Sequence, residues 1–194
     1  MKTFTVSLSL ITLLLITTTA VFFSSDQAWS DEDGDRSVFW DLSSLKRPGV
    51  APVSNDLYQQ ECGSCHMAYP PGLLPGASWR NMMETLDNHF GENAELAEST
   101  RTELLSYLLK NAAEVSDYRR SQKITRSLAE GEIVDRITSV PYFIRKHDEI
   151  PRRFVVDNPK VGSFSQCNAC HQNAAKGSFN EDEVSIPGVG YWHD

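Results

Sequence analysis

The chain has 194 residues, enough for one mid-sized domain or two small ones. Hydrophobic residues make up 40% and charged residues 23%, a composition that excludes a disordered or membrane-embedded protein. The net charge of −8 argues against a nucleic-acid binder, because phosphate binding needs a basic surface.

The N-terminus, residues 1–30, has the pattern of a secretory signal peptide. Lys2 is the only charged residue before Asp26, and residues 4–23 are apolar with interspersed Ser and Thr. Small residues on both sides of Trp29 mark a cleavage site, so we predict export with removal of this segment. An uncleaved membrane anchor is the alternative, because the apolar run is close to the ~20 residues that span a bilayer.

The next stretch predicts an extended arm followed by a short helix. Residues 31–53 are polar and mixed and form the predicted arm. Ser54 or Asn55 can then cap a helix that leads into the first cysteine motif. Prolines and glycines between positions 70 and 76 predict an irregular loop after that motif.

Two further helices complete the predicted N-terminal domain, residues 54–115. Ser78 can cap a helix over residues 79–90, which Gly91 is placed to end. Thr100 and Glu103 form a possible capping box for the following helix. The apolar residues of the two helices recur at helical spacing: Trp79, Met82, Met83, Leu86 and Phe90, then Leu104, Leu105, Leu108 and Leu109.

The C-terminal domain, residues 116–194, is predicted to be less regular. Residues 114–136 lack a strong apolar period, so we place the domain boundary there. A short helical stripe follows and ends at Pro151. Residues 163–175 predict a helix that Gly177 closes, and the tail from residue 184 predicts irregular structure. Without a strand pattern of useful length, the fold class is mainly α, with two small helical units. The residues of the short stripe are Val140, Phe143, Ile144 and Ile150.

All four cysteines lie in two Cys-x-x-Cys-His motifs, residues 62–66 and 167–171. Residues three and four apart share one face of a helix, so two thiols can form thioethers with one haem while the His faces its iron. This spacing is typical of c-type haem attachment. We therefore predict two covalently bound haem c groups. Their thioethers come from Cys62, Cys65, Cys167 and Cys170, and their first axial ligands are His66 and His171.

Other functions of paired cysteines fit this sequence less well. Zinc sites usually place their two Cys pairs about 15–20 residues apart, whereas these pairs are about a hundred residues apart. A thioredoxin-like motif needs a strand followed by a helix, which the pattern does not provide. Structural disulfides need no His after each pair.

The second axial ligand of each iron decides between electron transfer and small-molecule binding. Apart from the motif histidines, the candidates are His89, His147 and His193, with the thioethers of Met67, Met82 and Met83 as alternatives. His147 lies at the centre of the apolar stripe of its helix, where a hydrogen-bonded core His is the alternative. His89 lies at the edge of its helix stripe, where a solvated His near a helix C-terminus is the alternative. His193 is next to the chain end, where fraying is usual.

Charge is unevenly distributed along the chain. Residues 31–100 hold 12 acidic and 4 basic residues, a net of −8, whereas residues 119–153 hold 5 acidic and 9 basic residues, a net of +4. Ordinary solvated helix faces explain this difference. A docking patch, or a set of partners for haem propionates, is the functional alternative.

Several of these stretches resemble the dihaem cytochrome c family of bacterial periplasms. The similarity covers roughly residues 55–190. It rests on the two motifs, Tyr69-Pro70-Pro71 after the first, the His89-Phe90-Gly91 element, Arg145-Lys146-His147, and the tail around Ile186-Pro187-Gly188.

The resemblance implies a periplasmic electron carrier with two low-spin haems, each held by two histidines. It implies a class I cytochrome c-like N-terminal unit and a C-terminal unit with extended loops. His89 and His147 match positions that supply distal ligands, and domain order pairs His89 with the first haem and His147 with the second. The implied partners are other periplasmic cytochromes, an oxygen-binding high-spin cytochrome c or a membrane cytochrome b.

We therefore predict electron transport without substrate turnover, so the chain is not expected to be an enzyme. The main alternative is a dihaem peroxidase-like or small-ligand-binding haem enzyme with one open iron, but the chain has enough histidines to fill both irons. A haem-based gas or redox sensor is a third alternative. It is the weakest, because no recognisable signalling domain accompanies the haem motifs in this sequence.

Overall fold

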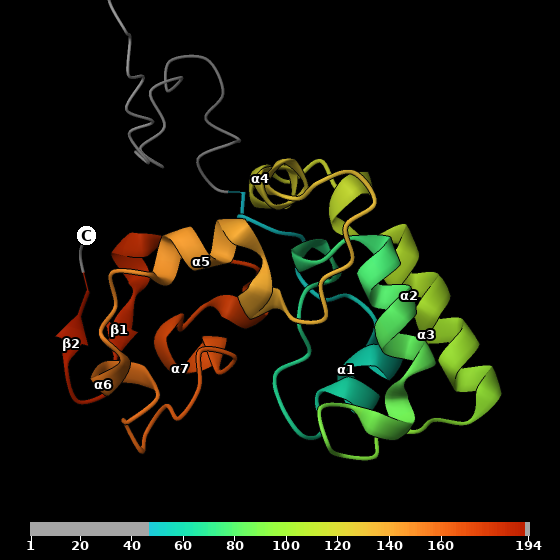
Figure 1. Ribbon diagram of the computed structural model, residues 1–194, viewed down its shortest axis with the longest axis horizontal. Coiled ribbons are helices and arrows are strands. Elements are labelled where there is room, and N and C mark those ends of the chain that lie inside the picture. The colour runs from blue at the N-terminus through green and yellow to red at the C-terminus, as the bar shows by residue number, and fades with distance from the viewer. Residues whose placement is uncertain (1–46, 193–194) are drawn as a thin grey trace, which may run out of the picture. The chain divides into compact units, whose positions relative to one another are not determined.

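The computed structural model describes residues 47–192, which are mainly helical (Figure 1). The predicted signal peptide, most of the predicted arm, and His193 lie outside the described residues. Between residues 47 and 192, no helix has the length and apolar character needed to cross a membrane.

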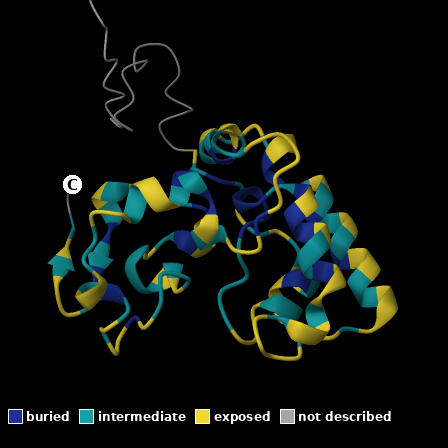
Figure 2. Ribbon diagram, viewed as in Figure 1, coloured by how far each residue is buried: buried dark blue, intermediate teal, exposed yellow. Residues whose placement is uncertain are grey.

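The first three helices form a small bundle around an apolar core. They are α1 (Asp56–Cys62), α2 (Gly76–Glu84) and α3 (Glu98–Lys110). The α1 helix begins at the predicted cap Asn55, whose side-chain oxygen accepts a 2.7 Å hydrogen bond from the Tyr58 amide. Figure 2 shows that α3 is exposed along its outer side. The core between α2 and α3 contains Trp79, Met83, Leu104 and Leu108.

The second predicted helix was wrong at both ends. Its observed counterpart α2 begins directly after Pro75 and stops at Glu84, before a separate 3-10 turn. Ser78 does not cap it, because its buried hydroxyl accepts a hydrogen bond from the Val134 amide at 3.0 Å. The predicted capping box of α3 was also wrong. That helix begins after Ala97, with no side-chain cap.

A helix that the sequence did not predict, α4 (Arg119–Ser127), occupies the polar stretch around the expected domain boundary. Its inward face is small, because it buries only Ser121 and Ile124, so its apolar period is weak. It packs against α5 (Pro141–His147), where the Ser127 hydroxyl accepts from the Tyr142 amide at 3.2 Å. The division at this boundary stays a prediction.

Short elements follow α5. They are α6 (Arg152–Val155), α7 (Cys167–Cys170), and an antiparallel pair of two-residue strands, β1 (Ser185–Ile186) and β2 (Gly190–Tyr191). The helix predicted over residues 163–175 is thus limited to four residues, and a small hairpin replaces part of the irregular tail. Gly177 adopts φ 78° and ends a 3-10 turn. The 3-10 turns are Pro71–Leu73, Leu86–Asn88, Ala113–Val115, Ile137–Ser139, Ala174–Lys176 and Glu181–Glu183. The mainly α fold class is confirmed.

Candidate functional site

The four cysteines form no disulfide with one another. Burial raises the pKa of Cys62 and of Cys167 to about 11, with smaller contributions from the neighbouring Glu61 and Cys170 respectively. Reactive thiolate sites show the opposite shift, a pKa well below the usual 8.5. The two motifs therefore do not have the electrostatics of a thiol-redox site.

The first motif lies opposite His89. Cys62 is the last residue of α1, and the turn that follows presents His66. The ring centres of His66 and His89 are 6.2 Å apart, with 25° between the ring planes. Two imidazoles that bind one metal ion from opposite sides should have ring centres about 6 Å apart. Each side contributes a metal–nitrogen bond of about 2 Å and roughly 1 Å from that nitrogen to the ring centre. The spacing of the two rings therefore fits one iron between them.

His89 lies on a tight turn and not on the predicted helix. Its amide donates to the Glu92 carbonyl at 2.7 Å, and the Glu92 amide donates back at 3.2 Å. The two residues between them, Phe90 and Gly91, have φ of 57° and 100°, the backbone that a two-residue hairpin turn requires. Burial, followed by the positive charge that His66 and Arg136 can carry, lowers the pKa of His89.

The two rings of this first pair are held differently. The Nδ1 atom of His66 lies 2.8 Å from the Met67 carbonyl oxygen, which fixes the ring orientation. The His89 ring has no hydrogen-bond partner among residues 47–192; it contacts the Phe90 ring at 4.8 Å between centres. Met82 lines the same surface pocket as His89, while Met83 is buried in the bundle core.

The second motif lies opposite His147, with the same separation. The ring centres of His147 and His171 are also 6.2 Å apart, but their planes are 72° apart. The helix α5 carries His147, whose Nδ1 atom lies 2.8 Å from the Phe143 carbonyl oxygen. The Phe143 ring stacks on the imidazole, with 3.9 Å between centres. This histidine thus makes the hydrogen bond expected of a core residue and still faces the motif histidine.

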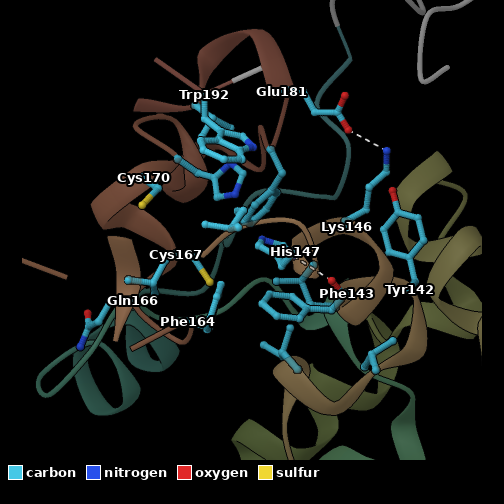
Figure 3. Close-up of a pocket in the computed structure, with 18 of the residues that line it drawn as sticks. Tyr142, Phe143, Lys146, His147, Phe164, Gln166, Cys167, Cys170, Glu181 and Trp192 are labelled. Carbon is cyan, nitrogen blue, oxygen red and sulfur yellow. Dashed lines mark hydrogen bonds and ion pairs between the residues drawn. The ribbon is translucent and has the colours of Figure 1, made fainter. Parts of the chain in front are cut away.

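An apolar pocket surrounds the second pair (Figure 3). It holds about 1090 Å³ of empty space, including space open to solvent. Burial, with smaller effects of His147 and Arg120, lowers the pKa of His171 to about 4, against the opposing effect of Glu183. The imidazole is therefore neutral at neutral pH, the form that binds a metal.

Two cations line this pocket. Arg120 donates to the Tyr142 hydroxyl at 2.8 Å and to the Phe179 carbonyl at 3.0 Å, and its buried Nε has no hydrogen-bond partner in the described chain. The Lys146 side chain, 9% exposed, pairs with Glu181 at 2.7 Å. Both belong to the basic stretch identified in the sequence, and both suit the carboxylates of a haem. The sequence did not single out Arg120, because nothing in its local pattern distinguishes it from its neighbour Arg119.

Outside these two pairs, residues 47–192 contain no group of three or more His, Cys, Asp or Glu residues that could hold a metal ion. The alternative of a zinc site built from both Cys pairs therefore finds no support in this part of the chain. Two facing histidines beside each Cys pair are the arrangement that axial ligation of a haem requires.

The dihaem cytochrome c family model matches residues 58–179, more than half of the chain. Three solved structures of bacterial cytochromes are similar. A new diheme cytochrome type c from Shewanella baltica OS155 is 49% identical and has a TM-score of 0.59, covering 72% of this chain and 98% of its own. A diheme cytochrome c from Rhodobacter sphaeroides is 43% identical with a TM-score of 0.60, covering 67% and 100%.

A structure of DHC purified from Rhodobacter sphaeroides is 40% identical with a TM-score of 0.53, covering 66% of this chain and 99% of its own. A comparison with curated proteins finds no significant match. The family match, the likeness over almost the full length of these structures, and the two motifs agree with one another. The chain belongs to the dihaem cytochrome c family and carries two covalently bound haem c groups.

Proposed function

We propose that this protein is a periplasmic electron carrier whose two haems are low-spin and six-coordinate. The first haem is held by His66 and His89, and the second by His171 and His147. The thioethers form at Cys62 and Cys65, and at Cys167 and Cys170. The observation that carries this proposal is the separation of 6.2 Å between ring centres in both pairs.

Each bound haem supplies a one-electron Fe(III)/Fe(II) couple. The chain holds, orients and shields it. The hydrogen bond from Nδ1 of His147 to the Phe143 carbonyl fixes the ring that faces the second iron. The hydrogen bond between His66 and the Met67 carbonyl does the same at the first. If His66 with His89, and His171 with His147, hold the two irons, neither site would leave a position for a substrate, which favours a carrier over an enzyme.

Two nitrogen ligands lower the potential of a haem relative to a His/Met pair, so we expect both potentials to be low. The electrons then come from, and go to, other periplasmic redox proteins. An oxygen-binding high-spin cytochrome c and a membrane cytochrome b are the proposed partners. The signal peptide that would deliver the protein to this compartment is proposed from the sequence of residues 1–30.

Single replacement of each proposed distal ligand tests this assignment. His89→Ala and His147→Ala should each turn one haem high-spin, visible in the absorption spectra of oxidised and reduced protein. His193→Ala and Met82→Leu are the matched controls and should leave both haems low-spin. A high-spin haem in the unaltered protein would favour the peroxidase-like alternative with one open iron. An unchanged spectrum in His89→Ala would move the ligand role to Met82 or His193.

A further inference from the structure

Tyr69 joins the two haem sites. Its ring packs on the imidazole of His66, with 4.8 Å between ring centres and 27° between planes. It follows the first motif by three positions and precedes the two prolines of the next loop. The side chain is thus in direct contact with an axial ligand proposed for the first haem.

The other end of the same side chain reaches the second site. The Tyr69 hydroxyl donates a 2.7 Å hydrogen bond to the carbonyl oxygen of Ser165, 96 positions along the chain. Ser165 lies two residues before Cys167, which begins α7.

Both ends of this connection are fixed by their surroundings. The Tyr69 carbonyl accepts a 2.9 Å hydrogen bond from the hydroxyl of Tyr58, a core residue of α1 that is 2% exposed. On the far side, the Ser165 amide donates to the Ser163 hydroxyl at 3.2 Å, and the two serine hydroxyls lie 2.7 Å apart. The aromatic ring therefore spans two anchored backbones and has little freedom to move.

We propose that Tyr69 is the positioning residue for electron exchange between the two haems. It holds the axial ligand His66 at a fixed place relative to the segment that attaches the second haem, and its side chain supplies a continuous contact between them. This inference rests on the proposed function, since it requires two haems that exchange electrons.

Removal of the Tyr69 contact should slow electron exchange between the two haems while leaving each haem itself little changed. Electron transfer between two haems slows as the distance between them grows or as the contact between them is lost. The Tyr69→Leu variant loses both the ring contact and the hydrogen bond. The Tyr69→Phe variant keeps the ring on His66 and loses only the bond to Ser165.

The experiment measures the rate of electron exchange between haems in half-reduced holoprotein after rapid photoreduction, together with the Tm. Tyr107→Phe is the matched control, because its hydroxyl accepts from the Ser54 amide at 3.3 Å and touches neither His pair. We expect exchange to slow several-fold in Tyr69→Leu, and by less in Tyr69→Phe. The control should exchange at the unaltered rate.

A purely structural role predicts a lower Tm with an unchanged exchange rate in both Tyr69 variants, and this result would overturn the proposal. If Tyr69→Leu does not take up haem, the exchange rate of Tyr69→Phe tests the proposal instead. This variant loses a single hydrogen bond and keeps its packing. Failure of the proposed function itself appears differently, as a high-spin haem in the unaltered protein before any exchange is measured.

Discussion

The two haem sites of this protein reach the same ligand separation by different means. In the first, the distal His89 lies on a two-residue turn, the rings are twisted by only 25°, and Cys65 is exposed. In the second, the distal His147 lies on a helix, the rings are twisted by 72°, and an apolar pocket surrounds them. Both separations are 6.2 Å. The spacing of the rings is therefore the same in both pairs, while the surrounding frame differs, as expected if each proposed pair holds one iron.

The difference extends to what stabilises each half. The first site is attached to a helical bundle that has its own core, including Trp79 and Leu104. The second is surrounded by the seven-residue helix α5, two helices of four residues each and a hairpin of two-residue strands. Such short elements bury little surface against one another. The second half should therefore depend on its haem for folding far more than the first.

Loss of the second haem should have the largest effect. Replacing Cys167 and Cys170 together by Ala should cost more than about 4–5 kcal/mol, the range reached when a core loses its filling. The paired change of Cys62 and Cys65 to Ala should cost less, because the first bundle keeps its core. Thermal unfolding followed by circular dichroism measures both. Equal losses of Tm in the two paired variants would contradict the claim that the second half depends more on its haem.

Ligand exchange should distinguish the sites next. The His89 ring lacks the protein hydrogen bond that His147 makes to Phe143, and losing such a partner typically costs 10–100-fold in metal affinity. The Nδ1 atom of His171 also lacks this bond, but the thioether proposed at the neighbouring Cys170 would hold this residue beside the haem. Added imidazole should therefore displace His89 about tenfold more readily than His147. A titration of oxidised protein followed by NMR of the haem methyl groups would show it, and simultaneous displacement would contradict the account.

The cations near the two sites should shift the potentials unequally. Arg120 is close enough to lower the pKa of His171, and its Nε is buried, whereas Arg136 beside the first site is exposed. A buried positive charge favours the reduced iron. Arg120→Gln should therefore lower the potential of the second haem by about 60 mV, a tenfold change for one electron. Arg136→Gln should shift the first by less, and Arg120→Lys should keep most of the original potential. A larger shift from Arg136 in a redox titration would reverse this order.

The smallest effect concerns the turn that carries His89. Gly91 has φ 100°, so Gly91→Ala should cost about 1–2 kcal/mol of unfolding free energy. Gly131→Ala is the matched control, because Gly131 has φ 74° and, like Gly91, open space around it. Denaturant unfolding should give similar losses for both variants. Only Gly91→Ala should also raise the affinity for imidazole. An equal rise in the control would show that this turn does not determine how firmly His89 is held.

Much of the first half could be predicted from its sequence. The apolar spacing predicted its helices, the cap Asn55 was one of two predicted, and Met83 packs in the core as its spacing indicates. The helix expected over residues 79–90 failed because its period continues past the point where the chain turns. The sequence predicts a cap at Ser78 because no local pattern marks its actual partner, the amide of Val134, which is distant in the sequence.

The second half was harder to predict, for a physical reason. Its elements are short, so residues 163–175 show the motif but not how short α7 is. The helix α4 buries only two residues and left no clear stripe. The roles of Arg120 and Tyr69 come from contacts across long sequence separations, of 59 and 96 positions, which no local pattern records.

The central claim is that both irons are held by two histidines. Electron paramagnetic resonance of the fully oxidised holoprotein tests it most directly, because it separates spin states and responds to the twist between axial rings. We predict two low-spin ferric signals of equal intensity. The first haem should give a rhombic signal from its nearly parallel rings, and the second a strongly anisotropic one from its nearly perpendicular rings. A high-spin signal that accounts for one haem per chain would contradict the account.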